Sequence, residues 1–188
     1  MARQSIYQLI VSMAQRFPGL PYAFQDVASA GGQEVLARLT EPPLPERRRQ
    51  QLAMDVLGQI QALVAGQGDR GALRTACERV PLARYARETA VRQRLLLDAG
   101  LLARESAYRL AMDLATGSTA ASLVQLGVVL LGAFENDVSR QVVRTLGLHS
   151  TLTIYALEAA GSYADPNAFY GDLARNTRRS EEHTSELQ

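Results

Sequence analysis

The chain has 188 residues, of which 47% are hydrophobic and 21% are charged, and its formal net charge is +1. A chain of this length forms one domain more readily than two, and the composition is typical of a soluble globular protein. The near balance of charge provides no global field that would attract nucleic acid or a membrane surface.

Cysteine usage and hydropathy indicate a cytoplasmic protein. Cys77 is the single cysteine, so an internal disulfide cannot form and a reducing compartment is expected. The N-terminal stretch does not read as a signal peptide, because Gln8 and Gln15 interrupt its apolar positions. The longest apolar run, 120–134, contains Gln125 and is shorter than the roughly 20 residues that a membrane helix needs. We therefore expect a buried core helix there and no membrane segment.

Helical rather than strand periodicity runs along almost the whole chain, which predicts an all-α fold. Two short helices are expected over 4–15 and 33–39, before a proline-rich linker at 41–46. The clearest helix follows at 51–65, where apolar residues recur at helical spacing and form one stripe. Further helices are expected over 70–78, 82–99, 104–115, 120–131, 135–146 and 151–160, with another that begins at Pro166 after an Asp165 N-cap.

Two segments of the second half repeat each other. The stretch LVQLGVVLLG at 123–132 aligns with LTIYALEAAG at 152–161, at an offset of 29 residues, and each ends in a glycine that reads as a helix stop. Each follows a helix whose apolar residues keep to one side. This alternation is typical of stacked helical hairpins in an α-solenoid, although a plain helical bundle needs only the amphipathic helices.

The stretch GLHSTLTIYALEAAGSYADPNAFYGDLA, at 147–174, contains a histidine-bearing joint, an apolar helix and an Asp-Pro helix start. It resembles uncharacterised bacterial proteins with HEAT-like helical repeats. The resemblance implies a HEAT-like right-handed α-solenoid of short antiparallel helix pairs. It also implies a scaffold that binds a protein partner rather than an enzyme.

The last ten residues, RSEEHTSELQ at 179–188, resemble the translation of a sequencing-library adapter. We therefore expect a non-native tail there and a native chain that continues beyond Arg178, so that the solenoid is truncated at its C-terminus. The expected organisation is N-terminal helices at 1–40, the linker at 41–46, a helical-repeat domain at 47–178, and the tail.

The stretch GQGDRG at 66–71 matches the glycine pattern of dinucleotide-binding loops. Such a loop needs a strand before it and a helix after it, whereas the residues before Gly66 form the clearest helix of the chain. We predict a joint between two helices, in which Gly66 ends the first one.

Seven arginines lie between Arg70 and Arg94, opposed only by Glu78 and Glu88. Within the expected helix 82–99, Arg84, Arg87, Arg92 and Arg94 fall on one broad face. A basic face of this kind can follow a phosphate backbone, which makes nucleic-acid binding through 70–94 the alternative function. The other interpretation is a solvated face on which Glu88 pairs with Arg84 and with Arg92.

The sequence favours a protein-interaction scaffold with no catalytic site, no cofactor and no metal. A single histidine outside the tail, His149, offers no ligand spacing and is expected to hydrogen-bond a helix end. Cys77 reads as a small core residue. The residues expected to bind the partner are charged residues at the rims of the repeat surface: Arg84, Arg87, Arg92, Arg94, Glu135, Asp137, Arg140 and Arg144.

Overall fold

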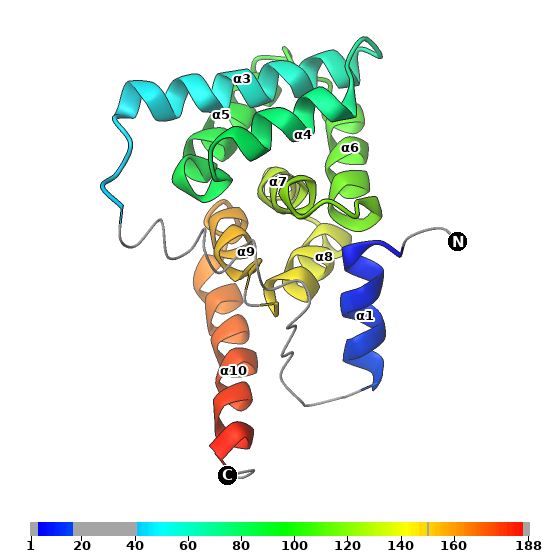
Figure 1. Ribbon diagram of the computed structural model, residues 1–188, viewed down its shortest axis with the longest axis vertical. Helices are drawn as coiled ribbons and strands as arrows, with labels where there is room; N and C mark the ends of the chain where they lie inside the picture. Colours follow the sequence, from blue (N-terminus) through cyan, green and yellow to red (C-terminus); the bar gives the residue numbers. More distant parts are fainter. Residues whose placement is uncertain (1–3, 17–40, 150, 186–188) are drawn as a thin grey trace.

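The computed structural model describes residues 4–16, 41–149 and 151–185, and side chains as far as Arg175. All regular structure in this part is helical (Figure 1), which confirms the predicted all-α fold. The helices are α1 (Ile6–Arg16), α3 (Glu46–Val64), α4 (Arg70–Arg79), α5 (Ala86–Asp98), α6 (Arg104–Gly117), α7 (Ala121–Leu131), α8 (Asp137–Gly147), α9 (Thr153–Ala160) and α10 (Pro166–Ser185), with a 3-10 turn at Leu82–Arg84. The helix expected at 33–39 lies outside the described residues.

Local signals explain where several of these helices begin. Ser5 and Gln8 cap α1 reciprocally, each side chain bonding the other residue's backbone N–H at 3.2 and 3.3 Å. Asp165 caps α10 as predicted, because its Oδ1 accepts from the Ala168 N–H at 3.1 Å.

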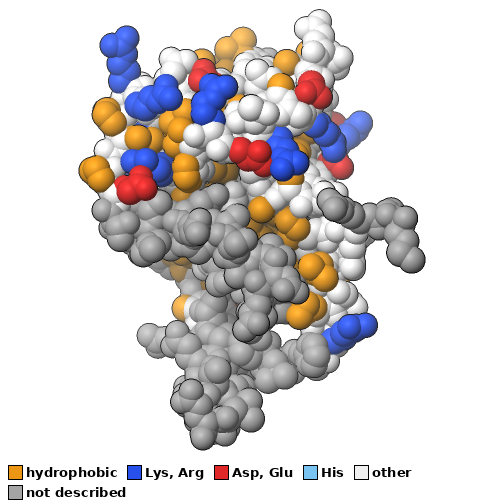
Figure 2. All heavy atoms as spheres, in the orientation of Figure 1, with side chains coloured by type: hydrophobic (Ala, Val, Ile, Leu, Met, Phe, Trp, Pro, Cys, Tyr) orange, Lys and Arg blue, Asp and Glu red, His pale blue; other side chains and the backbone are white. Residues whose placement is uncertain are grey.

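Charged side chains are spread over the surface of the described part, among hydrophobic ones (Figure 2).

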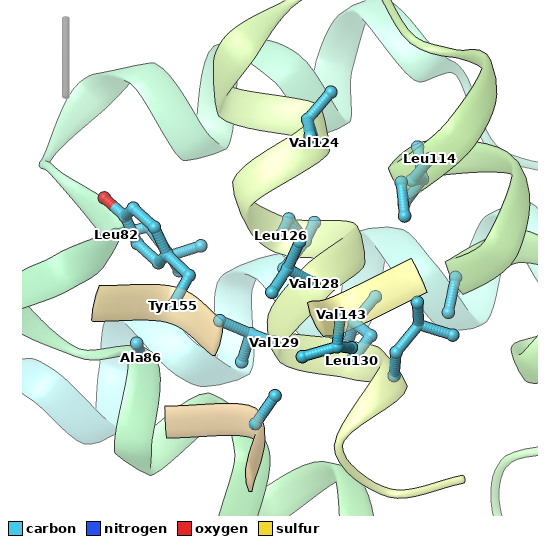
Figure 3. Close-up of a cluster of buried hydrophobic side chains, with 14 of the residues drawn as sticks. Leu82, Ala86, Leu114, Val124, Leu126, Val128, Val129, Leu130, Val143 and Tyr155 are labelled. Atoms are coloured by element: carbon cyan, nitrogen blue, oxygen red, sulfur yellow. The ribbon is translucent and has the colours of Figure 1, made fainter. Parts of the chain in front are cut away.

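Helix α7 lies in the middle of the molecule (Figure 1) and forms its core. Every residue from Leu123 to Leu131 is buried, because α4, α5, α6, α8 and α9 all pack around this helix. Figure 3 shows its side chains meeting Leu114 of α6, Val143 of α8 and Tyr155 of α9. The apolar run at 120–134 is therefore the buried core helix that the sequence predicts.

Two glycines let α7 approach its neighbours closely. A Cβ added to Gly127 would lie 2.5 Å from the backbone nitrogen of Ala115 on α6. One added to Gly132 would lie 2.7 Å from the Cα of Ala159 on α9. Gly132 keeps an ordinary helical φ of −58°. Glycine is therefore needed at position 132 because α7 and α9 pack closely there, and not because the backbone adopts a left-handed conformation.

The left-handed glycines are Gly66 and Gly100, with φ of 73° and 68°. Each follows a helix, and each is closed by the same pair of backbone bonds. After α3, the Gly66 N–H donates to Leu63 and the Gln67 N–H donates to Ala62, at 3.0 and 2.9 Å. This pattern is a Schellman motif, for which glycine is the preferred residue.

Helices α3 and α5 run side by side in the same direction. Near their N-terminal ends the Arg49 guanidinium binds the Glu88 carboxylate. Near their C-terminal ends, the Gln61 Nε2 in the last turn of α3 donates to the carbonyl of Leu101, just after α5, at 3.1 Å. These two contacts fix the relative register of the pair.

The helix contacts combine features of a stack and of a compact bundle. Helices α3, α5, α7 and α9 contact one another in series, as the first helices of stacked pairs would. However, α4 also contacts α7, and α5 also contacts α9. Each of these contacts skips a pair, whereas units of a linear repeat array contact only their neighbours. The HEAT-like right-handed solenoid is therefore not confirmed.

Candidate partner-binding surface

The helix expected over 82–99 is in fact two elements. Leu82–Arg84 forms a 3-10 turn, and α5 begins only at Ala86. Between them Tyr85 leaves the helical region, with φ of −144° and ψ of 15°, and its side chain is buried. The prediction of one continuous helix is wrong here, so Arg84 does not share a helix face with Arg87, Arg92 and Arg94.

Arg84 is bound within the molecule. Its Nη1 lies 2.7 Å from the Glu41 carboxylate, and its Nη2 donates to the Pro42 carbonyl at 2.9 Å. Only 18% of its side chain is exposed. Arg84 therefore ties the proline-rich segment 41–44 to the turn before α5, around a hollow of about 290 Å³.

Glu88 also has a partner that the sequence did not indicate. Arg49 of α3 donates from Nε to the Glu88 carboxylate and from Nη1 to the Leu44 carbonyl, the latter at 3.1 Å. The expected pairs of Glu88 with Arg84 and with Arg92 are not formed. Glu88, which was expected to neutralise the arginines of its own helix face, instead forms an ion pair that links α5 to α3.

A shallow groove of about 270 Å³ opens between α3 and α5. We call it the α3–α5 groove; its lining residues are Gln50, Arg87, Glu88, Val91, Arg92 and Leu95. Val91 is 54% exposed and Leu95 is 60% exposed. Met54 of α3, one helical turn beyond Gln50, is 47% exposed. Val91 and Leu95 are thus large apolar side chains presented to solvent within one groove.

The charges around the α3–α5 groove do not balance. Within the described residues, Arg47, Arg87, Arg92 and Arg94 have no carboxylate partner, and Arg94 donates only to the Ser162 carbonyl at 3.2 Å. Figure 2 shows arginine and hydrophobic side chains next to one another over the part of the surface where α3 and α4 face the viewer.

Among the described residues, the acids near the α3–α5 groove, Asp55 included, already have hydrogen-bond or ion-pair partners. The Glu46 carboxylate accepts from the Gln50 amide at 2.8 Å, and Glu88 binds Arg49. Asp98 lies 3.9 Å from the Arg104 guanidinium. The described residues therefore give the groove an excess of positive charge beside its apolar centre.

Val91, Leu95 and Met54 are the residues that sequence reasoning missed. A signal for the first two was available: they stand four residues apart on the arginine-bearing side of their helix, away from buried positions such as Thr89 and Gln93. Apolar residues that recur at helical spacing outside the core stripe indicate a second, exposed contact face.

The second predicted cluster holds the C-terminal helices together. Arg140 pairs with Glu135 at 3.2 Å, and its guanidinium lies 5.5 Å from the centre of the Tyr163 ring. The other Glu135 oxygen accepts from the Ala164 N–H at 2.9 Å. Both residues are therefore engaged with the joint between α9 and α10.

Arg144 makes a two-point contact with Asp172 of α10, from Nε and from Nη2, the second at 3.3 Å. Hydrogen bonding to this carboxylate raises the already high pKa of Arg144. Asp137 is exposed in the first turn of α8, at a hollow of about 390 Å³ that Arg140, Arg144 and Asp172 also line. Glu135, Arg140 and Arg144 thus connect α8 and the residues just before it to the α9–α10 joint and to α10.

The glycine-rich stretch 66–71 is a joint between α3 and α4, as predicted. Asp69 caps α4 by accepting from the Ala72 N–H at 2.9 Å. Because a helix precedes the loop instead of a strand, the arrangement of a dinucleotide site is not met. Gly66 supplies the left-handed residue that ends α3.

His149 and Cys77 are both buried. His149 Nδ1 accepts from the Thr151 N–H at 3.3 Å, so the ring bonds the turn just before α9 rather than the helix end itself. Burial lowers the pKa of His149. Burial raises the pKa of the Cys77 thiol to about 12, and the repulsion of Glu78 adds to this, so the thiol is an unreactive core group.

Within the described residues, no group of three or more His, Cys, Asp or Glu side chains is placed to hold a metal ion. None of the helices described is both long and apolar enough to cross a bilayer. Comparisons with protein-family models, with curated proteins and with solved structures find no match for the chain.

Proposed function

We propose that the chain is a non-catalytic protein-interaction scaffold and that the α3–α5 groove takes up its protein partner. The observation that carries the proposal is the exposure of Val91 and Leu95 in a hollow edged by arginines without carboxylate partners among the described residues. Contiguous exposed apolar side chains with a polar rim are characteristic of interaction sites. The proposal includes a HEAT-like stacking of helix pairs, which the serial contacts of α3, α5, α7 and α9 support.

The size of the α3–α5 groove favours a protein partner over a small molecule. Its volume of about 270 Å³ lies below the roughly 300–1,000 Å³ of typical ligand pockets. A hollow of this size accepts one or two apolar side chains from a larger surface. Interfaces commonly concentrate their binding energy in a few such side chains.

The same surface favours protein over nucleic acid. Arg70, Arg74 and Arg84, three of the seven arginines in 70–94, pair with Asp113, Glu78 and Glu41. Among the described residues, the lining of the groove is aliphatic at its centre and includes no aromatic side chain on which a base could stack. Nucleic-acid binding through 70–94 therefore remains the second proposal.

A selection experiment tests the proposed function. A random peptide library is selected on the whole chain, and the recovered peptides are measured against a Val91→Ser/Leu95→Ser variant. The expected result is a loss of binding of about tenfold or more, because the variant removes the apolar centre of the interface. Val138→Ser is the matched control, since Val138 is 58% exposed on α8, outside the groove. Peptides that bind all three proteins equally would contradict the proposal.

A further inference from the structure

We infer that the occupant of the α3–α5 groove is an acidic amphipathic α-helix of the partner protein. This inference rests on the proposed function and specifies the partner's chemistry. It is carried by three properties of the groove: its charge, its apolar spacing and the type of backbone surface around it.

The charge of the groove selects an acidic occupant. Arg87 and Arg92 line it, and Arg94 lies about two helical turns beyond Arg87 on the same face of α5. Arg47 lies on the same side of α3 as Gln50 and Met54, at helical spacing. These four guanidinium groups lack carboxylate partners in the described part of the chain. Carboxylates of a partner would form ion pairs with these guanidinium groups. Charge complementarity of this kind governs partner choice and association rate.

The positions of the charges match the two flanks of a docked helix. At 100° per residue, Val91 and Leu95 lie between Arg87 and Arg94 on one side of α5 and Arg92 on the other. An apolar stripe that enters the groove would therefore have cationic side chains on both borders. An amphipathic helix with acidic residues on either side of its apolar stripe can form ion pairs along both borders at once.

The apolar spacing also suits a helix. Val91 and Leu95 are four residues apart on one helix, which is about 6 Å along its axis. Side chains at i and i+4 of an incoming helix have the same separation, so successive apolar side chains can pack beside them. Met54 is also exposed on α3, one helical turn beyond the lining residue Gln50.

The surrounding surface gives little basis for other modes of peptide recognition. Addition of a partner strand requires a sheet edge, and the described residues form helices but no strand. Binding of a polyproline segment uses an aromatic-lined groove, whereas none of the described residues that line this one is aromatic. A helix laid along a groove between two helices is the mode that the geometry supports.

Designed peptides test the inference with the protein unaltered. The probe is a fluorescein-labelled amphipathic peptide of about 18 residues, long enough to form a helix, with leucines on one face and glutamates on both borders. The second peptide has every glutamate replaced by glutamine, and the third has the acidic composition in scrambled order. Fluorescence anisotropy with the full chain should show the acidic peptide binding at least tenfold more tightly than either of the others. Raising the salt concentration should weaken it.

Variants locate the binding on the protein. Arg87→Gln combined with Arg92→Gln should weaken the acidic peptide about tenfold, as the loss of two exposed ion pairs allows. Arg109→Gln is the matched control, because Arg109 pairs with Glu105 on α6 at 3.0 Å. Val91→Ser should also weaken binding, whereas Val138→Ser should not.

The outcomes separate this inference from the proposed function. If library peptides depend on Val91 and Leu95 but the glutamate and glutamine peptides bind equally, the acidic-helix inference is wrong and the scaffold proposal stands. If no peptide depends on these residues, both fail. If a DNA duplex displaces the acidic peptide and binds with steep salt dependence, the groove is a nucleic-acid surface and the inference is overturned.

Discussion

Gly132 and Ala159 bring α7 and α9 into backbone contact, since a Cβ on the glycine would lie 2.7 Å from both the Cα and the carbonyl oxygen of the alanine. No flexible side-chain end is available to give way at this point. The contact is therefore a fixed element of the core.

The substitution Gly132→Ala should destabilise the fold by about 1–3 kcal/mol, because the added methyl group forces the α7 and α9 backbones apart. The measurement is the free energy of unfolding from urea titration. Gly58→Ala is the matched control, because Gly58 lies within α3 with no atom within 4 Å of an added Cβ. That change should instead stabilise by about 0.5–1 kcal/mol through helix propensity. Equal effects at the two sites would contradict the close packing.

Removing the Arg144–Asp172 pair should loosen α10 from α8. Because both side chains are about one-third exposed, solvent screening limits the coupling to at most about 1 kcal/mol. A double-mutant cycle with Arg144→Gln and Asp172→Asn measures it in unfolding experiments. The coupling should fall in 1 M salt, owing to the short screening length there. A coupling of zero at low salt would show that the contact contributes nothing to stability.

The Cys77 thiol should make the fold sensitive to alkali. Burial raises its pKa from an ordinary value of 9.0 to about 12, so the folded state keeps the thiol neutral while the unfolded chain ionises it. The stabilising contribution is complete below pH 9 and is lost as the pH rises toward 12. Relative to Cys77→Ala, the wild type should lose about 1 kcal/mol per pH unit in this window.

A chemical measurement checks the same thiol independently. At pH 8 the native chain should react with a disulfide reagent such as DTNB only as fast as it unfolds, since the reactive thiolate is suppressed by burial. Addition of urea should release one thiol per chain, as the single cysteine requires. Rapid reaction of the native protein would place Cys77 at the surface.

His149 should make the fold sensitive to acid. Burial lowers its pKa below the ordinary value of 6.5, so the unfolded chain takes up a proton in a range where the folded chain does not. The stabilising contribution is present above pH 6.5 and is lost as the pH falls below it. The free energy of unfolding should drop between pH 7 and pH 5 for the wild type more than for His149→Gln. Identical pH profiles would contradict a buried neutral histidine.

The sequence predicted most helices because their signals are local. Periodic apolar residues, the Asp165 cap and the left-handed Gly66 act within a few residues of the feature they produce. The break at Tyr85 has no such signal: neither proline nor glycine stands there, and the break accompanies burial of the Tyr85 side chain in the core. Tertiary packing overrode a helical pattern at this point.

The candidate site was less predictable because its charges are settled by distant residues. Glu88 stands four residues from both Arg84 and Arg92 in the sequence, yet it binds Arg49, 39 positions earlier in the chain. Arg84 is likewise occupied by Glu41. Sequence spacing indicates which cations share a helix, but only the fold determines which of them have a carboxylate partner.

The common direction of α3 and α5 gives the groove between them an electrical polarity along its length. The Arg49–Glu88 contact places both N-terminal ends at one end of the groove, and the Gln61–Leu101 contact places both C-terminal ends at the other. The partial positive charges of two helix N-termini therefore add at one end, and the partial negative charges of two C-termini add at the other. The electrostatic energy of a helix in the groove is most favourable when it runs antiparallel to α3 and α5, with its C-terminal end beside Arg47 and Arg87. For the helix that we propose as the occupant, the two walls therefore favour one direction of insertion.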